Sequence, residues 1–148
     1  MVTGRIYNLT QVDYSARGQI VKIIVDSVPK SQTVIFFGID CFGENYYFTE
    51  EGLKYITDSR RGRQTQEFVL HYLNKIPKTL ATPLLLGHNL LEMENFLYCQ
   101  KYAIEEHLNK KELLAVVLKK SNITVVWNFY WLEKNKLPHH IEILQHFK

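Results

Sequence analysis

The stretch LLAVVLKKSNITVVWNFYWL, residues 113–132, decides the fold class of this chain of 148 residues. Its two arms, residues 113–119 and 123–132, are rich in the β-branched and aromatic residues that are typical of strands. Between the arms, Lys120-Ser121-Asn122 has the composition of a tight turn. The stretch therefore predicts an antiparallel hairpin whose second strand is aromatic.

Two more strand-like segments precede this hairpin. Residues 84–88 (LLLGH) are a short apolar run that ends before Asn89, and residues 95–104 (NFLYCQKYAI) alternate between two faces. Together with the hairpin, they predict a meander of three to four antiparallel strands in the C-terminal half of the chain.

Additional strands are expected near the N-terminus, within residues 20–48. Residues 20–27 alternate between an apolar and a mixed face, and Pro29 is expected to end this strand. Residues 33–39 are a nearly continuous apolar run, which is typical of a buried strand, and residues 44–48 form a short third strand.

One or two central helices are expected between the two groups of strands. Thr49 is a suitable N-cap for a helix over residues 50–57, whose first turn is acidic as the helix dipole favours. After a polar segment at residues 58–64, the helical period returns from Thr65, and Pro77 marks the end of that second helix. Its expected apolar stripe is Val69, Leu73, Ile76 and Leu80.

The order of these elements predicts an α+β fold, in which one or two helices pack on a curved antiparallel sheet. The length suits a single globular domain over residues 1–148, with the helices and the main sheet at 49–132. A short terminal helix is expected at residues 139–147. The alternating units of a Rossmann-type fold and the GxGxxG, GxxxxGK[ST] and GxSxG motifs are absent from the sequence.

Composition places the chain among ordinary globular proteins. Apolar residues make up 46% and charged residues 22%, which argues against disorder, and the net charge of +3 neither indicates nor excludes a nucleic-acid partner. The two cysteines, Cys41 and Cys99, form no disulfide framework, and no signal peptide or membrane span is visible. These features predict a cytoplasmic protein without a membrane partner, and no motif indicates a cofactor.

A cluster of arginines is the first candidate for chemistry. Arg60, Arg61 and Arg63 lie within four residues, beside Gly62. Guanidinium groups bind phosphate oxygens in a bidentate manner, and a glycine lets the backbone approach a ligand closely. The alternative is a solvated junction between helices, in which the arginines pair with acidic neighbours.

The aromatic strand is the second candidate. Strict alternation would place Trp127, Phe129 and Trp131 on one face, with Asn128 and Tyr130 on the other. The first three are expected in the core. Asn128 and Tyr130 either pack there too or line a site, where the amide would bind a phosphate oxygen and the phenol would stack on a base.

Lys101 and His88 complete the candidates. Lys101 interrupts an apolar strand face, so it either serves a site or lies in water on an edge strand. His88 ends a strand and is the histidine best suited to general acid or base catalysis. The C-terminal histidines, His139, His140 and His146, have no nearby cysteine or aligned acid and predict a solvated terminus, not a metal site.

The organisation of residues 46–132 resembles the small metal-independent ribonuclease domains of barnase, RelE and colicin type, which are often called BECR-like and occur in phage and toxin systems. The resemblance rests on YYFTEEGLKYITDSRRGR (46–63), on the helix at 67–83 and on the strands that follow. Thr49, Leu53 and Ile56 fit the family's Thr-x-x-x-Leu-x-x-Ile segment. The chain departs from the family at Ser59-Arg60-Arg61, where many members carry a histidine.

The resemblance implies an RNA-binding or RNA-cleaving domain that forms a 2′,3′-cyclic phosphate without a metal ion. In that case Arg60, Arg61, Arg63 and Lys101 would stabilise charge, His88 or Tyr130 would move protons, and Asn128 would position the phosphate. Arg63, Lys119 and Lys120 would hold the nucleic acid. The alternative is a catalytically degenerate fold that acts as a protein-interaction module or a complex subunit, with a partner such as a cognate inhibitor.

Overall fold

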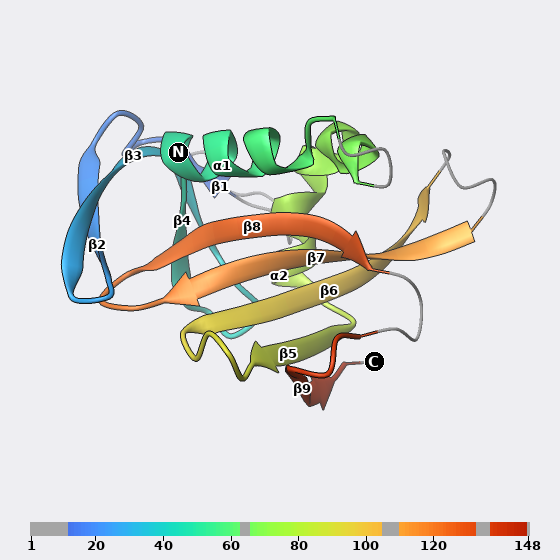
Figure 1. The fold of residues 1–148 in the computed structure, drawn as a ribbon. Coiled ribbons are helices and arrows are strands. Elements are labelled where there is room, and N and C mark those ends of the chain that lie inside the picture. Colours follow the sequence, from blue (N-terminus) through green and yellow to red (C-terminus); the bar gives the residue numbers. More distant parts are fainter. Residues whose placement is uncertain (1–11, 63–65, 105–109, 133–136, 148) are drawn as a thin grey trace.

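The computed structural model describes residues 12–62, 66–104, 110–132 and 137–147, which form nine strands, two α-helices and one 3₁₀ helix (Figure 1). In chain order the elements are β1 (Val12–Asp13), β2 (Ile20–Val25), β3 (Val28–Ile39), β4 (Asn45–Thr49), α1 (Glu50–Arg60), the 3₁₀ helix η1 (Glu67–Lys75), α2 (Ile76–Ala81), β5 (Leu85–Asn89), β6 (Asn95–Ile104), β7 (Lys110–Lys120), β8 (Thr124–Leu132) and β9 (Ile141–His146). The α+β class expected from the sequence is confirmed.

The described strands form one sheet in the order β1-β3-β4-β8-β7-β6-β5-β9, and β2 pairs with β3 as a protruding hairpin. Strands β5 to β8 are the antiparallel meander that the sequence predicts. Among the described strands, β4 and β8 alone run parallel, and they pair at Tyr47 and Val125. This single parallel contact joins the N-terminal strands to the meander.

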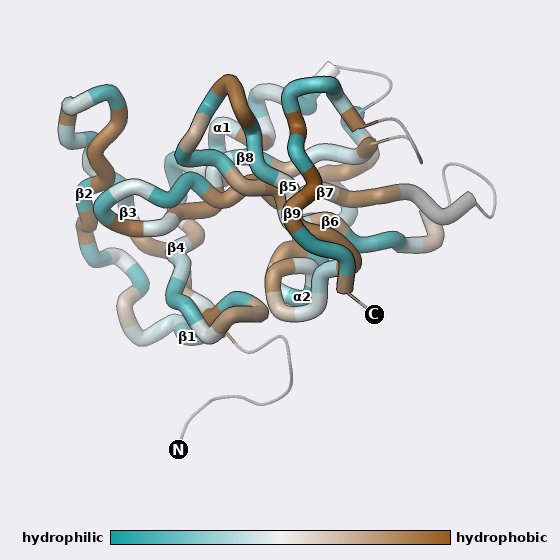
Figure 2. Tube along the Cα trace, turned by 90° about the horizontal axis from the view of Figure 1, so that it is seen from below, coloured by the Kyte–Doolittle hydropathy of each residue, from teal (hydrophilic) through white to brown (hydrophobic). Residues whose placement is uncertain are grey.

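The helices pack on one face of the sheet, and this face holds the larger core. Ile56 of α1, Val69 of η1 and Leu80 of α2 lie against strand residues such as Leu114 and Phe129. Seen from below, α2 lies to one side of the strands β5, β7 and β9 (Figure 2). The opposite face carries a second apolar cluster, whose buried members come from strands: Leu85, Leu97, Cys99, Leu113, Ala115, Val117 and Ile141.

A β-bulge in β8 changes which aromatic residues share a face. Leu118 pairs with Val126, but the next residue of β7, Val117, pairs with Asn128, so Trp127 is the extra residue. Phe129 therefore points into the larger core while Trp127 packs on the second cluster. The expectation that Trp127 shares a face with Phe129 and Trp131 is wrong, because the bulge resets the alternation.

The expected second helix is interrupted. It consists of the 3₁₀ helix η1 followed by the short helix α2, and Tyr72 has a non-helical backbone (φ −117°, ψ 16°). Pro77 lies in the first turn of α2 and does not end a helix there. Proline is favourable at that position because the first helical N–H groups have no intrahelical partner.

The C-terminal segment is a strand, so the expected helix at residues 139–147 is wrong. β9 pairs antiparallel with β5, and the backbone N–H of Phe147 donates to the carbonyl of Leu84. The outer edge of β5 needs hydrogen-bond partners, and this need outweighs the helical spacing of Ile141 and Leu144. Pro29 likewise does not end a strand, since it pairs with Ile24 at the start of β3.

Helix α1 begins as predicted but extends three residues further, to Arg60. The Thr49 hydroxyl caps it by accepting a hydrogen bond of 3.0 Å from the N–H of Gly52, and it donates to Oε1 of Gln32 at 2.7 Å. Gly52 lies directly against β8, since a Cβ there would be 2.8 Å from the carbonyl oxygen of Val126. Within the described residues, no helix is long and apolar enough to cross a membrane.

Replacing Gly52 with alanine is expected to lower the free energy of unfolding by about 1–2 kcal/mol. Alanine gains about 1 kcal/mol of helix propensity. The new methyl group would collide with backbone, which cannot easily move, so the overpacking cost lies in the upper part of the usual range, at about 2–3 kcal/mol. Denaturant unfolding measures the change, and Lys54→Ala, on the exposed side of α1, is the control. A Gly52→Ala protein more stable than the wild type would contradict the close contact.

Candidate functional site

Helix α1 carries Arg60 to the aromatic strand. The buried residues of α1 are Gly52, Ile56 and Arg60, four residues apart, so they form one stripe that faces the sheet. Figure 1 shows α1 lying along β8. Arg60 is the last residue of this stripe and only 8% exposed, so the guanidinium group is held at the surface of β8 and is not part of a solvated loop.

Arg60 brings together two of the residues that the sequence singles out. Its Nη2 donates a hydrogen bond of 3.1 Å to Oδ1 of Asn128, and its guanidinium carbon lies 5.5 Å from the centre of the Tyr130 ring. Asn128 Oδ1 also accepts from the backbone N–H of Phe129 at 2.8 Å. Arg60, Asn128 and Tyr130 therefore form one cluster, with the cation against the face of the ring.

The surface of the sheet beside this cluster is apolar. Tyr130 pairs across the sheet with Ala115, which in turn pairs with Cys99, and Asn128 pairs with Val117. Directly paired residues of antiparallel strands lie on the same face, so these side chains belong to the second apolar cluster.

Trp127 and Lys119 extend the same face toward the β7–β8 turn. The Lys119 ammonium lies 5.2 Å from the centre of the Trp127 ring, 3.4 Å from Oε1 of Glu94 and 3.5 Å from Oδ1 of Asn95. The Lys119 side chain is 8% exposed, so the charge is held in place below the surface. The sequence did not identify Trp127 as a site residue, because the residues around it give no indication of a bulge.

Three hydrogen-bond donors on this face have no partner among the described residues. They are Nε1 of Trp127, Nδ2 of Asn128 and Oη of Tyr130, and none of the three is a buried atom left unsatisfied. Each is therefore a donor that the described residues leave unused, and it can bind a ligand that offers acceptors. We call the surface formed by Arg60, Lys119, Trp127, Asn128 and Tyr130 the β8 face.

Lys101 lies on the same side of the sheet as the β8 face, beyond Tyr130. In the sheet, Lys101 is paired with Leu113, and Leu113 is paired with Leu132. This row of paired residues lies two residues along the strands from the row that contains Tyr130. The pairing of β5 with β6 stops at Cys99, and the N–H of Lys101 donates to Oε1 of Gln100. The Lys101 side chain is exposed, although β6 lies between β7 and β5 in the sheet.

Arg61 is exposed at the end of α1 and is separate from the β8 face. Together with Lys54, whose hydrogen bond is the larger cause, it lowers the pKa of Asp58 below the ordinary value. This is the solvated arrangement that the sequence left open for the arginine cluster. Arg63 lies outside the described residues.

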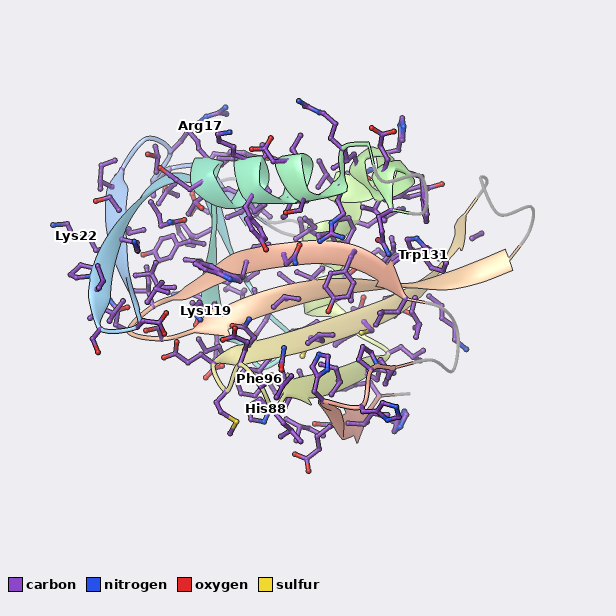
Figure 3. All side chains as sticks on the ribbon, in the orientation of Figure 1. Arg17, Lys22, His88, Phe96, Lys119 and Trp131 are labelled. Atoms are coloured by element: carbon purple, nitrogen blue, oxygen red, sulfur yellow. The ribbon has the colours of Figure 1, made fainter. Side chains whose placement is uncertain are left out.

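His88 and Lys120 lie on the helix-covered face. His88 stacks on Phe96, with ring centres 4.5 Å apart, and Phe96 pairs with Leu118 of the larger core (Figure 3). His88 Nε2 lies 2.7 Å from the carbonyl oxygen of Met93, so this nitrogen carries a proton and donates. Lys120 is 5.0 Å from the same Phe96 ring. The structure therefore does not bring His88 or Lys120 to Arg60.

Gln66 closes the edge of β8 next to the site, and sequence reasoning missed it. Its Oε1 accepts from the N–H of Trp131 and its Nε2 donates to the Trp131 carbonyl, both at 3.1 Å. At Trp131, where β4 no longer pairs with β8, the side-chain amide makes the hydrogen bonds that a neighbouring strand would otherwise make. A lone glutamine between two expected helices gives no signal of this role.

Burial keeps the phenol and the thiol of this face protonated. It raises the pKa of Tyr130 to about 12, with a further rise from Cys99 and an opposing effect of Arg60. Burial also raises the pKa of Cys99 to about 12. The Tyr130 hydroxyl is thus a donor at neutral pH. The described residues contain no group of three or more metal-ligating His, Cys, Asp or Glu side chains.

Tyr130→Phe is expected to leave stability at pH 7 nearly unchanged and to reduce its loss at alkaline pH. The Tyr130 phenol ionises near pH 10 in the unfolded chain but near 12 in the fold, so stability is complete below pH 10 and falls as the pH rises toward 12. Urea unfolding at pH 7, 10 and 11 tests this, with Tyr55→Phe, an exposed tyrosine, as control. Equal alkaline losses in Tyr130→Phe and wild type would contradict the raised pKa of this phenol.

The chain matches no protein-family model, no curated protein and no solved structure.

Proposed function

We propose that the chain binds single-stranded RNA on the β8 face. The observation that carries the proposal is the set of three unpartnered donors, on Trp127, Asn128 and Tyr130, beside two fixed cations. RNA offers acceptors on its phosphates, on its 2′-hydroxyls and on its base edges. Single strands are usually bound by aromatic side chains next to cationic groups, which is the composition of this face.

The charges of this side of the sheet favour a polyanion. Arg60, Lys119 and Lys101 are cationic, and Glu94, which is half exposed, is the carboxylate paired with Lys119. Rows of side chains on one face repeat about every 6.6 Å, so the three steps from the Lys119 row to the Lys101 row span about 20 Å. That length accommodates a short single strand of the size that small binding domains take, on the order of four nucleotides.

Binding is better supported than cleavage. The two groups that the ribonuclease resemblance implies for proton transfer do not suit that role at the β8 face. His88 lies on the opposite face of the sheet, and the raised pKa of Tyr130 keeps its phenol protonated at neutral pH. The alternative of a protein-interaction module is supported by apolar surfaces elsewhere on the molecule and does not need the β8 face.

Tyr130→Ala and Trp127→Ala are each expected to weaken RNA binding by about 5- to 150-fold, since loss of stacking costs about 1–3 kcal/mol per base. Fluorescence anisotropy with a labelled 12-nucleotide oligouridine at several salt concentrations measures the effect. Lys101→Ala is expected to reduce the salt slope by about 0.7, because one phosphate contact is lost. Lys54→Ala, an exposed cation on α1, and His88→Ala are matched controls that should bind as the wild type does.

Circular dichroism of each variant separates loss of binding from loss of folding. Absence of binding by the folded wild-type protein at about 100 μM would overturn the proposal. Cleavage of the RNA in the presence of EDTA, with a 2′,3′-cyclic phosphate product, would instead support the nuclease that the sequence resemblance implies. Equal effects of His88→Ala and Tyr130→Ala would place the RNA on another surface.

A further inference from the structure

The exposed face of β2 combines apolar side chains with a cation. Ile20, Lys22 and Ile24 alternate along the strand, and they pair with Thr33, Ser31 and Pro29 of β3. Ile20 is 60% exposed and Ile24 is 40% exposed. Lys22 points away from the body of the molecule (Figure 3). We call Ile20, Lys22 and Ile24 the β2 surface.

The loop between β5 and β6 also combines two exposed apolar side chains with a charge, which here is negative, and the three residues are consecutive. Leu91 is 75% exposed and Met93 is 61% exposed, and the exposed carboxylate of Glu92 lies between them in the sequence. We call Leu91, Glu92 and Met93 the loop surface. Neither surface belongs to the β8 face, and the large apolar side chains that both present to water are typical of interaction sites.

Hydrogen bonds hold both surfaces in a fixed shape. On β2, Oδ1 of Asn122 accepts from the N–H of Ile24 at 2.8 Å and Nδ2 donates to the carbonyl of Lys22 at 2.9 Å. At the loop, Oδ1 of Asn89 accepts from the N–H groups of Leu91 and Glu92. Preformed surfaces lose little conformational entropy on association, so even a small contact is effective.

We propose that the β2 surface of one molecule binds the loop surface of a second copy of this chain. The apolar residues would pack together, and Lys22 would pair with Glu92 of the other copy. This charge complementarity favours a second copy of the chain as the binding partner. RNA and anionic lipid would repel the carboxylate of Glu92, whereas the chain itself offers an apolar surface with a matching cation. Two such contacts between the same molecules would close a dimer, and single contacts would extend a chain.

The association is expected to be weak. Each side contributes three main residues, well below the 20–30 residues per side of a standard interface, so a Kd on the order of 100 μM is expected. Sedimentation velocity from about 10 to 500 μM covers this range. A wild-type protein that remains monomeric across the whole range overturns the proposal.

Charge exchange tests the pairing itself. Lys22→Glu and Glu92→Lys are each expected to weaken association by about 10-fold, because each juxtaposes like charges. The double variant Lys22→Glu/Glu92→Lys restores the opposite charges and should associate within about 3-fold of the wild type. All these positions are exposed, so the variants are expected to fold.

Lys30→Glu is the matched control, since Lys30 is an exposed lysine of the same hairpin and pairs with the buried Ile23 on its other face. It should associate like the wild type. An effect of Lys30→Glu equal to that of Lys22→Glu, or a double variant that stays monomeric, overturns the assigned contact. The measurement uses no RNA, so its failure is distinct from a failure of RNA binding.

Discussion

The close approach of α1 to the backbone of β8 determines where the functional groups lie. Gly52 allows it, because any larger residue would meet the carbonyl of Val126. A helix that is fixed at this point and repeats every four residues on its buried side places Ile56 in the core and Arg60 over Asn128. The position of the cation therefore follows from a helix–strand contact two turns away.

The same contact explains the irregular edge of β8. β4 pairs with β8 only near Val125, and beyond this point α1 and η1 occupy the space where a further strand would lie. The backbone of β8 still needs hydrogen-bond partners there, since unpaired buried peptide groups are costly. Gln66 supplies them at Trp131. An edge closed by a side chain in this way offers no free backbone groups at Trp131 to another strand.

Sequence patterns predict the parts of this fold that depend on local chemistry. The alternation of β6, the turn at Lys120-Ser121-Asn122 and the cap at Thr49 each follow from residues close together in the chain, and the structure has them. The sequence misses features that depend on distant partners. β9 is a strand because the outer edge of β5, on the side away from β6, needs hydrogen-bond partners. The bulge at Trp127 depends on the register between β7 and β8.

The candidate site was predictable to the same extent. Alternation correctly placed Asn128 and Tyr130 on one face, and of the arginine cluster Arg60 lies beside them while Arg61 does not. Spacing along the chain cannot tell which face of a sheet a distant strand presents. Lys101 on β6 lies two strands from β8, and His88 on β5 lies three strands from it, yet the two side chains are on opposite sides of the sheet. Arg60 and Lys119 are nearly buried beside aromatic rings, so these cations fix the rings and raise the electrostatic potential above them. In the proposed complex, such a face would bind through the orientation of bases as much as through charge. That mode would suit single strands more than non-specific binding of a duplex.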